Sequence, residues 1–158
     1  METENGTRWL AADEQRSWRI HLDVGRLMTR QLSRDLEPFG LTCNTYEVLV
    51  SLTEAPEHRM RISALARATV QPKSRLSQQI SRMEAAGLVR REVCESDLRG
   101  LYVVLTEEGW ETMRTVAPHQ VAAVRRHFID LLRADDLAAL DKALTPIVEH
   151  LRGKAWPG

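Results

Sequence analysis

The stretch 72–86 carries several flat or forked hydrogen-bonding side chains at helical spacing. On a helix, one face of this stretch would hold Ser74, Arg75, Gln78 and Arg82. A guanidinium matches the O6 and N7 acceptors of guanine, and a glutamine amide matches the N6 and N7 edge of adenine. Lys, Glu or Ala would serve a merely solvated face equally well. We therefore interpret this face as a DNA-reading surface. Ser74, Arg75 and Gln78 are assigned to base edges, and Lys73 and Arg82 to phosphates.

The opposite face of the same stretch is apolar. Its stripe is formed by Leu76, Ile80 and Met83, which follow the i, i+4, i+7 pattern of a buried helix face. Pro72 suits the first helical position, and Gly87 suits a left-handed residue just past the end. The sequence therefore predicts a helix over 72–86 with one buried and one exposed face.

The elements around this helix predict a winged helix over 59–106. A short helix over 61–68, with Ser63 as its N-cap, precedes it through a turn at 69–71. After Gly87 come two runs rich in β-branched and aromatic residues, 88–94 and 101–105, separated by a turn-rich tip. Helix, turn, helix and a two-stranded β hairpin, or wing, make a winged helix-turn-helix.

These residues resemble the MarR family of bacterial transcription regulators. The matching motifs are Ser63-x-Leu65-Ala66, Arg82-Met83-Glu84-x-x-Gly87-Leu88-Val89-x-Arg91, Asp97-x-Arg99-Gly100 and Leu105-Thr106-Glu107-x-Gly109. The resemblance covers nearly the whole chain. It implies a dimeric DNA-binding repressor or activator, often released by a small ligand.

The wing supplies two further candidate residues. Arg99, placed at the hairpin tip, would enter the minor groove, whose negative potential attracts arginine. Asp97 lies two residues earlier, where a free carboxylate is badly placed to approach DNA. We expect Asp97 to pair with Arg99 or Arg75 and to fix the shape of the tip, as the family's Asp-x-Arg wing also implies. The alternative is a solvated turn with an incidental ion pair.

Length and composition are those of one soluble globular domain. The chain has 158 residues, 43% of them apolar and 28% charged. No apolar run approaches the ~20 residues of a membrane span, and the N-terminus lacks a secretory core. Two cysteines are too few for a disulfide framework. We expect a cytoplasmic protein without a membrane partner.

Charge is unevenly distributed along the chain. The net charge is zero, which alone argues against a nucleic-acid partner. However, residues 59–92 hold eight basic and two acidic side chains, whereas residues 1–58 hold six basic and ten acidic ones. A basic module on an acidic scaffold provides a local footprint for phosphates, so we expect double-stranded DNA as the partner.

Long amphipathic segments flank the winged helix. We expect helices over 13–37 capped by Asp13, over 43–54 capped by Thr42, over 107–132 capped by Thr106, and from Asp135 or Asp136 to 151. Pro118 predicts a kink or break near Ala117. Thr145-Pro146 could start a further helix. The predicted architecture is mainly α with a small two-stranded wing.

The flanking segments carry more apolar surface than one winged helix can cover. We therefore expect one domain over 1–158, in which 8–58 and 107–152 form a dimerisation scaffold. Intertwined N- and C-terminal helices of a homodimer would bury the excess. The family resemblance implies the same arrangement.

Other functions have weaker support. The chain lacks a phosphate-binding glycine loop, a G-x-S-x-G elbow and an H-E-x-x-H motif, so we predict no enzyme and no cofactor. His119 and His127 are eight residues apart and do not have the i, i+4 spacing that places two imidazoles on one helix face. We assign no metal site, although a zinc-responsive regulator of the same fold stays open. Cys43 and Cys94 are interpreted as structural thiols, and redox sensing is the alternative for either of them.

A small-molecule effector is the remaining expectation for the scaffold. The family resemblance places a pocket between the first two helices, the fifth helix and the DNA module. The candidate lining residues are Trp18, His21, Met28, Trp110, Met113 and His119. Plain core packing is the alternative for each. A winged helix can also serve as a protein-interaction module, and salt-sensitive binding of duplex DNA would distinguish the two functions.

Overall fold

A computed structural model describes residues 7–94 and 97–153, with side chains placed for all of these except 94 and 97–99. The elements in chain order are α1 (Ala12–Leu36), η1 (Glu37–Phe39), α2 (Cys43–Glu54), η2 (Pro56–His58), β1 (Arg59–Arg61), α3 (Ile62–Ala68), α4 (Lys73–Ala85), β2 (Val89–Cys94), β3 (Asp97–Leu105), α5 (Glu107–His127), η3 (Ile129–Leu131) and α6 (Ala134–Gly153). None of the described helices has the length and apolarity needed to span a bilayer.

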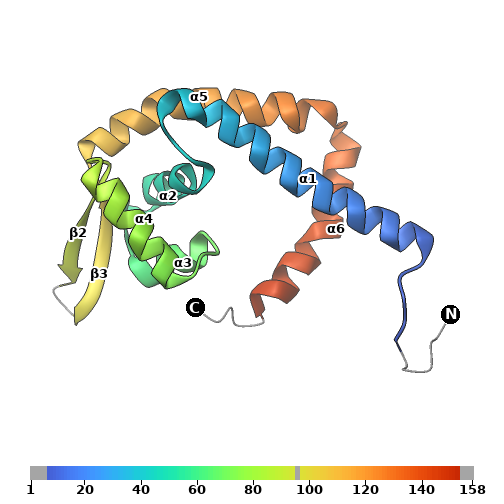
Figure 1. Ribbon diagram of the computed structural model, residues 1–158, viewed down its shortest axis with the longest axis horizontal. Helices are drawn as coiled ribbons and strands as arrows, with labels where there is room; N and C mark the ends of the chain where they lie inside the picture. Colours follow the sequence, from blue (N-terminus) through green and yellow to red (C-terminus); the bar gives the residue numbers. More distant parts are fainter. Residues whose placement is uncertain (1–6, 95–96, 154–158) are drawn as a thin grey trace.

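The elements group into a winged-helix end and a scaffold end. Figure 1 shows α3, α4 and the strands at one end, with α1 and α5 running side by side above α2. The N-terminal half of α1 extends away from this end, whereas α6 starts at the far end of α5 and runs back obliquely beneath it. The expected mainly α winged helix-turn-helix is therefore observed.

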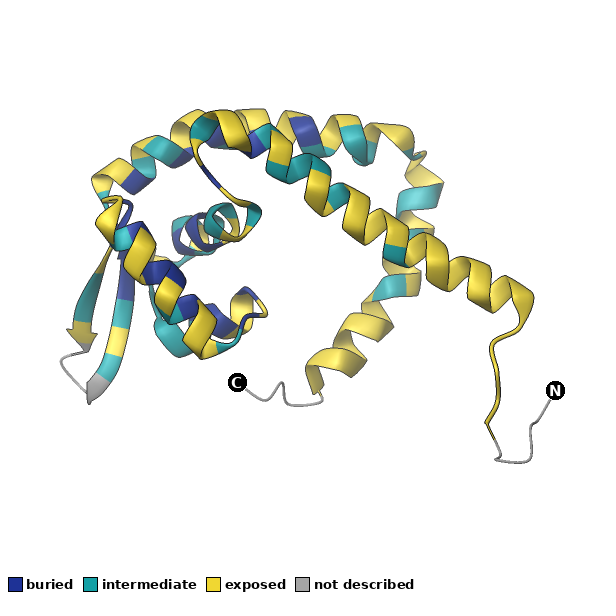
Figure 2. Ribbon diagram, viewed as in Figure 1, coloured by how far each residue is buried: buried dark blue, intermediate teal, exposed yellow. Residues whose placement is uncertain are grey.

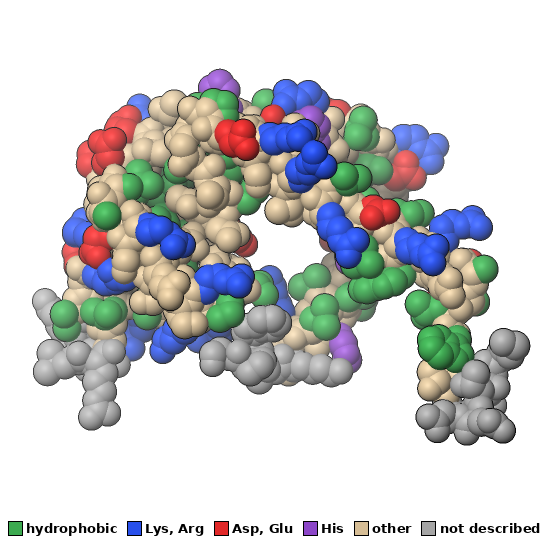
Figure 3. All heavy atoms as spheres, viewed as in Figure 1, with side chains coloured by type: hydrophobic (Ala, Val, Ile, Leu, Met, Phe, Trp, Pro, Cys, Tyr) green, Lys and Arg blue, Asp and Glu red, His purple; other side chains and the backbone are tan. Residues whose placement is uncertain are grey.

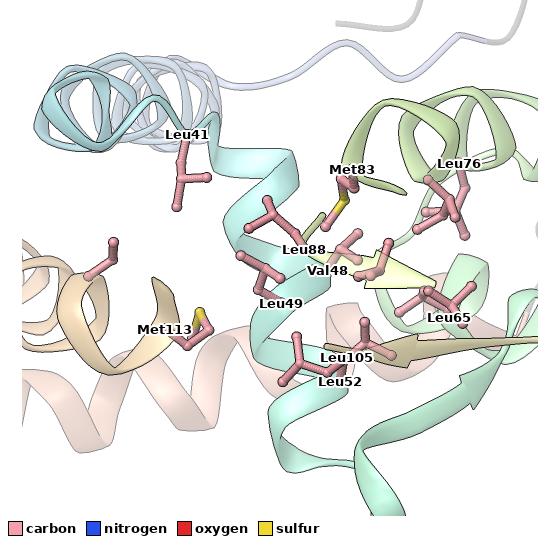
Figure 4. Close-up of a cluster of buried hydrophobic side chains, with 14 of the residues drawn as sticks. Leu41, Val48, Leu49, Leu52, Leu65, Leu76, Met83, Leu88, Leu105 and Met113 are labelled. Atoms are coloured by element: carbon pink, nitrogen blue, oxygen red, sulfur yellow. The ribbon is translucent and has the colours of Figure 1, made fainter. Parts of the chain in front are cut away.

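The core lies where α2 meets α3, α4, the sheet and the first turns of α5 (Figure 4). Its fully covered side chains include Leu36, Val48, Leu49, Leu52, Leu65, Leu76, Ile80, Val89, Val103 and Val116. Met83 is 3% exposed, so the predicted apolar stripe of α4 is buried along its length. This burial fixes one face of α4 toward the protein and leaves the other to solvent.

Three local signals in the sequence predicted helix ends correctly. The Thr42 hydroxyl accepts a hydrogen bond from Thr45 N at 3.1 Å and caps α2. The Thr106 hydroxyl accepts from Gly109 N at 3.0 Å and caps α5. Gly87 lies just past α4 with φ of 76°, the left-handed conformation that a residue without Cβ adopts readily.

Four other expected helix starts are wrong. α6 begins at Ala134, so the expected caps Asp135 and Asp136 lie inside its first turn. The cap position of α3 is Arg61, not Ser63, because β1 holds residue 61 in extended backbone until the helix begins. For α1 the cap position is Ala11, and the carboxylate that serves this end belongs to Glu14, which accepts from Ala11 N at 2.8 Å. Asp13 is one of the acidic residues of the first turn. Pro72 is the cap residue of α4, one position earlier than expected.

The sheet has a third strand that the sequence pattern missed. β1 pairs antiparallel with β3, which also pairs with β2, so the strand order is β1-β3-β2. A strand of only three residues shows no readable alternation. β3 also begins earlier than expected, at Asp97, so Arg99 and Gly100 belong to a strand and not to the turn.

The prolines inside α5 and α6 do not interrupt these helices. α5 continues through Pro118 and ends at His127, short of the expected 132. Its buried residues Val116, Gln120 and Ala123 lie on both sides of the proline, so packing offsets the lost backbone hydrogen bond. α6 likewise contains Pro146 in its interior instead of a new helix start. At its beginning, Asp136 accepts hydrogen bonds from the backbone and guanidinium of Arg133, which lowers the pKa of its carboxyl.

Candidate nucleic-acid interface

The outer face of α4 presents the residues that the sequence singled out. Lys73, Ser74, Arg75, Gln78 and Arg82 are all exposed, on the side opposite the buried stripe. Figure 2 shows this alternation of exposed and buried colour along α4, and Figure 3 shows Lys and Arg side chains over α3 and α4. The arrangement offers hydrogen-bond donors and positive charge along one accessible helix.

The turn that leads into α4 is conformationally unusual. Val70 has φ of 50°, a left-handed conformation that a β-branched residue adopts at a cost in free energy. Val70 is also 57% exposed, so burial of its side chain does not offset this cost. The next residue, Gln71, is buried, and neither polar atom of its side chain has a hydrogen-bond partner. The sequence suggested neither feature, because both depend on how α3 and α4 pack.

The wing contacts α4 through one arginine that the sequence analysis did not select. Arg91 of β2 donates from its guanidinium to the carbonyl oxygen of Ser77 and to the hydroxyl of Ser81, each at 2.9 Å. The same guanidinium forms an ion pair with Glu84, and Arg91 N donates to Glu84 Oε1 at 2.9 Å. Glu84 and Arg91 both belong to one of the family motifs quoted above, but their spacing in the sequence does not show that the two side chains meet.

Other basic residues, on β1 and β2, contact acidic and aromatic side chains of the protein itself. The guanidinium carbons of Arg59 and Arg61 lie 5.1 and 5.7 Å from the ring centroid of Tyr102. Arg59 also pairs with Glu57 at 2.5 Å, and Arg90 pairs with Glu92 at 2.6 Å. Four of the eight basic side chains counted over 59–92 therefore contact acids or an aromatic ring. The other four, Arg67 of α3 and Lys73, Arg75 and Arg82 of α4, are exposed.

The wing residues Asp97 and Arg99 are placed only by their backbone. Both belong to β3, with Asp97 paired to Cys94 across the hairpin. Their side chains lie outside the described set, as do residues 95 and 96 of the expected tip. Their assigned roles therefore remain predictions from sequence.

The expected pocket residues do not converge within one chain. Trp18 stacks on His21 at 5.6 Å on the exposed half of α1. Met28 lines a groove of about 670 Å³ between α1 and the end of α5. Met113 belongs to the buried core.

The other two candidates lie near the DNA module and near η1. Trp110 packs against His58 with 4.8 Å between ring centroids, and both line a shallow cavity of about 370 Å³. His119 packs against Phe39 at 5.1 Å. The six candidates therefore do not line one shared pocket, although Trp18 and His21 stack on each other.

His127 and Cys43 each contact a polar side chain of α1. His127 Nε2 lies 3.2 Å from Asp35 Oδ2 between α5 and α1. Cys43 Sγ lies 3.1 Å from Ser33 Oγ in a partly buried position. Within residues 7–94 and 97–153, no three His, Cys, Asp or Glu side chains are grouped as metal ligands.

A helix-turn-helix with an exposed recognition helix and an adjoining β wing defines a winged-helix protein of the regulator class. A sequence model of the MarR family matches residues 39–100. The structure is also similar to that of AbsC, a MarR family transcriptional regulator from Streptomyces coelicolor. AbsC is 68% identical, with 94% of this chain and 100% of AbsC covered and a TM-score of 0.91. The chain therefore belongs to the MarR family.

Two further relatives agree with this placement. Sco3205, a MarR family transcriptional regulator from Streptomyces coelicolor solved in complex with DNA, is 37% identical, covers 96% of each chain and has a TM-score of 0.91. The regulator PecS of Dickeya dadantii is 28% identical over 130 residues, which is 81% of this chain and 77% of PecS. These relatives are transcriptional regulators, in agreement with the interpretation of this chain as a regulator and not an enzyme.

Proposed function

We propose that the protein binds an inverted-repeat operator in duplex DNA as a homodimer and represses transcription there. The exposed face of α4 beside the wing is the observation that carries this proposal. Support comes from the DNA complex of Sco3205, at 37% identity over nearly the full length. A regulator of this kind acts in the cytoplasm, where bacterial DNA lies.

The N-terminal half of α4 is the part that we assign to the major groove. A major groove about 12 Å wide admits an α-helix. Ser74 and Gln78 are one helical turn apart on the exposed face, with Arg75 beside them. These three side chains would contact base edges, while Lys73 and Arg82 would contact phosphates on either side of the groove.

The dimer is supported by apolar surface that a single chain leaves uncovered. α6 contains no buried residue, and its Ile147, Val148 and Leu151 are exposed. The exposed side chains of α1 include Trp18, Ile20, Val24 and Leu27. Figure 2 shows the N-terminal half of α1 and most of α6 exposed, and Figure 3 shows open space between α1, α6 and the DNA module.

A second copy of the chain is the occupant that we assign to this surface. The groove between α1 and the end of α5 has a volume of about 670 Å³ and an apolar lining that includes Ile20, Leu27, Phe128 and Leu131. A two-fold dimer buries such a face symmetrically and presents two α4 helices to one side of the duplex. Half-sites about one helical turn apart, roughly 10 base pairs, then follow.

Selection of bound duplexes from a random pool tests the proposed function. An enriched inverted repeat, bound with an affinity that falls steeply as salt is added, is the expected result. If the pool yields no enriched sequence, and the protein instead binds other proteins with little dependence on salt, a protein-interaction module would be favoured. Light scattering at micromolar concentration should give twice the mass of one chain, and the mass of one chain would contradict the dimer.

Repression and release by an effector require a functional assay. Transcription in vitro from a promoter that contains the enriched repeat should fall when the protein is added. Stimulation of transcription would assign the protein as an activator. A small molecule that restores transcription and weakens operator binding would identify the effector that the family resemblance implies.

A further inference from the structure

Arg91 joins the wing to the middle of α4 through several hydrogen bonds. Its guanidinium reaches Ser77 O and Ser81 Oγ at 2.9 Å and pairs with the Glu84 carboxylate. We propose that Arg91 is a positioning residue that locks the wing and the recognition helix in one relative orientation, so that both reach DNA together. This inference rests on the DNA-binding function proposed above.

The contacts lie along one flank of α4. Ser77, Ser81 and Glu84 are spaced at i, i+4 and i+7, so they form a stripe on the helix surface. The core stripe that contains Leu76 and Ile80 is next to it, each residue offset by one position. Because a helix turns 100° per residue, two anchored stripes fix the rotation of α4 about its axis. That rotation decides which side chains face the groove.

The chemistry of the contact requires an arginine. Ser77 O also belongs to the helix ladder, and a carbonyl oxygen can accept a second hydrogen bond. A planar guanidinium serves the carbonyl, the hydroxyl and the carboxylate at once, whereas a lysine ammonium is a point charge. Arg91 is 23% exposed, so this network is shielded from solvent more than an ordinary surface pair.

Arg91 lies on β2 at some distance from the wing tip, so its contact with α4 influences where the tip lies. Arg91 pairs with Val103 of β3, near the base of the hairpin. The end of β2 at Cys94 is three residues further, a distance of about 10 Å in a strand. A small change in strand direction at Arg91 therefore displaces the wing tip by a larger amount.

The neighbouring Arg90 provides a matched control. It carries the same charge on the same strand, but its guanidinium bonds to Glu92, which is also on β2, at 2.6 and 3.0 Å. Arg90 is exposed and is on the opposite side of the sheet from Arg91. Substituting either residue by alanine removes one positive charge, and only Arg91→Ala removes the link to α4.

The experiment measures binding of wild type, Arg90→Ala, Arg91→Ala and Arg91→Lys to the duplex selected from the random pool and to a scrambled duplex. We expect Arg91→Ala to lose at least about tenfold on the selected duplex and far less on the scrambled one, so that the ratio of the two affinities falls. Arg90→Ala should lower both affinities equally and slightly. Arg91→Lys should recover only part of the ratio, and it also covers the case in which Arg91→Ala fails to fold.

Each other outcome overturns a specific statement. Equal losses for Arg90→Ala and Arg91→Ala, or full recovery with Arg91→Lys, would show that Arg91 acts by charge and not by position. A ratio unchanged in both Arg91 variants would also refute the proposal. Failure of wild type to prefer any duplex would instead refute the DNA-binding function on which the inference rests.

Discussion

The hydroxyl of Thr106 donates a hydrogen bond of 2.6 Å to the carbonyl oxygen of Gly87. The same hydroxyl accepts from Gly109 N and caps α5, and Thr106 N donates to Leu88 O at 3.2 Å. The first turn of the scaffold helix α5 is therefore fastened to the turn that ends the recognition helix. This junction fixes the start of α5 relative to the C-terminal end of α4.

Replacing Thr106 by valine should destabilise the fold more than an ordinary cap deletion. Valine keeps the shape but loses both the cap and the bond to Gly87, so we expect a loss of about 2 kcal/mol in the free energy of unfolding. The control is Thr42→Val, which removes the cap of α2 and an exposed contact to the Thr45 hydroxyl at 3.0 Å but no bond to another element, and should cost about 1 kcal/mol. Equal losses in the free energy of unfolding, measured by urea titration of the two variants, would contradict a stabilising contribution from the Thr106–Gly87 hydrogen bond.

Replacing Gly109 by alanine should also destabilise the junction. A Cβ there would lie 2.2 Å from the backbone oxygen of Leu88 and 2.7 Å from Leu105 Cδ1. Backbone cannot yield as a flexible side chain does, so we expect a loss of roughly 2–3 kcal/mol. Gly153→Ala, at a position with nothing within 4 Å, should change the unfolding free energy by less than about 0.5 kcal/mol. Thermal unfolding of both variants gives the comparison.

Replacing Val70 by asparagine should stabilise the protein. The left-handed backbone at residue 70 penalises valine, and asparagine tolerates it, so we expect a gain of about 1 kcal/mol. Val93 is matched in exposure, at 58% against 57%, but it pairs with Leu101 of β3, next to a register irregularity, and does not have a positive φ. Val93→Asn should therefore lose stability. A loss in both variants would show that the turn does not strain Val70.

Gln78 and Arg82 should affect DNA binding in different ways. Gln78→Ala should relax base preference at a few operator positions, because it removes a contact to base edges. Arg82→Ala should weaken all sequences alike and lower the salt slope of log K by roughly one. Binding of both variants to a panel of single-base operator changes, at several salt concentrations, checks the distinction. Identical behaviour would refute it.

Substitutions at Asp97 and Arg99 test the roles predicted for the wing. Arg99→Ala should cost on the order of 1–3 kcal/mol of DNA binding, with a larger loss on A·T-rich flanks. Asp97→Ala should also weaken binding, although it removes a negative charge close to phosphates. Simple electrostatics predicts the opposite sign, so tighter binding by Asp97→Ala at fixed salt would exclude its structural role.

The sequence by itself determined the features that depend on neighbouring residues. The two faces of α4, the caps Thr42 and Thr106 and the left-handed Gly87 were all predicted from residues within one or two turns. These interactions involve groups only a few positions apart, so spacing is sufficient to identify them. The winged-helix class and the candidate DNA-contacting face follow from them.

Only the tertiary structure decided the features that depend on distant segments. β1 exists because Arg59–Arg61 meets β3 some forty residues later, and that pairing moved the start of α3 away from Ser63. Packing on both sides of Pro118 kept α5 continuous where local chemistry favours a break. The link from Arg91 to Ser77 likewise joins two elements whose relative orientation no local pattern contains. Pairing and packing across the chain outweighed local preference at each of these positions.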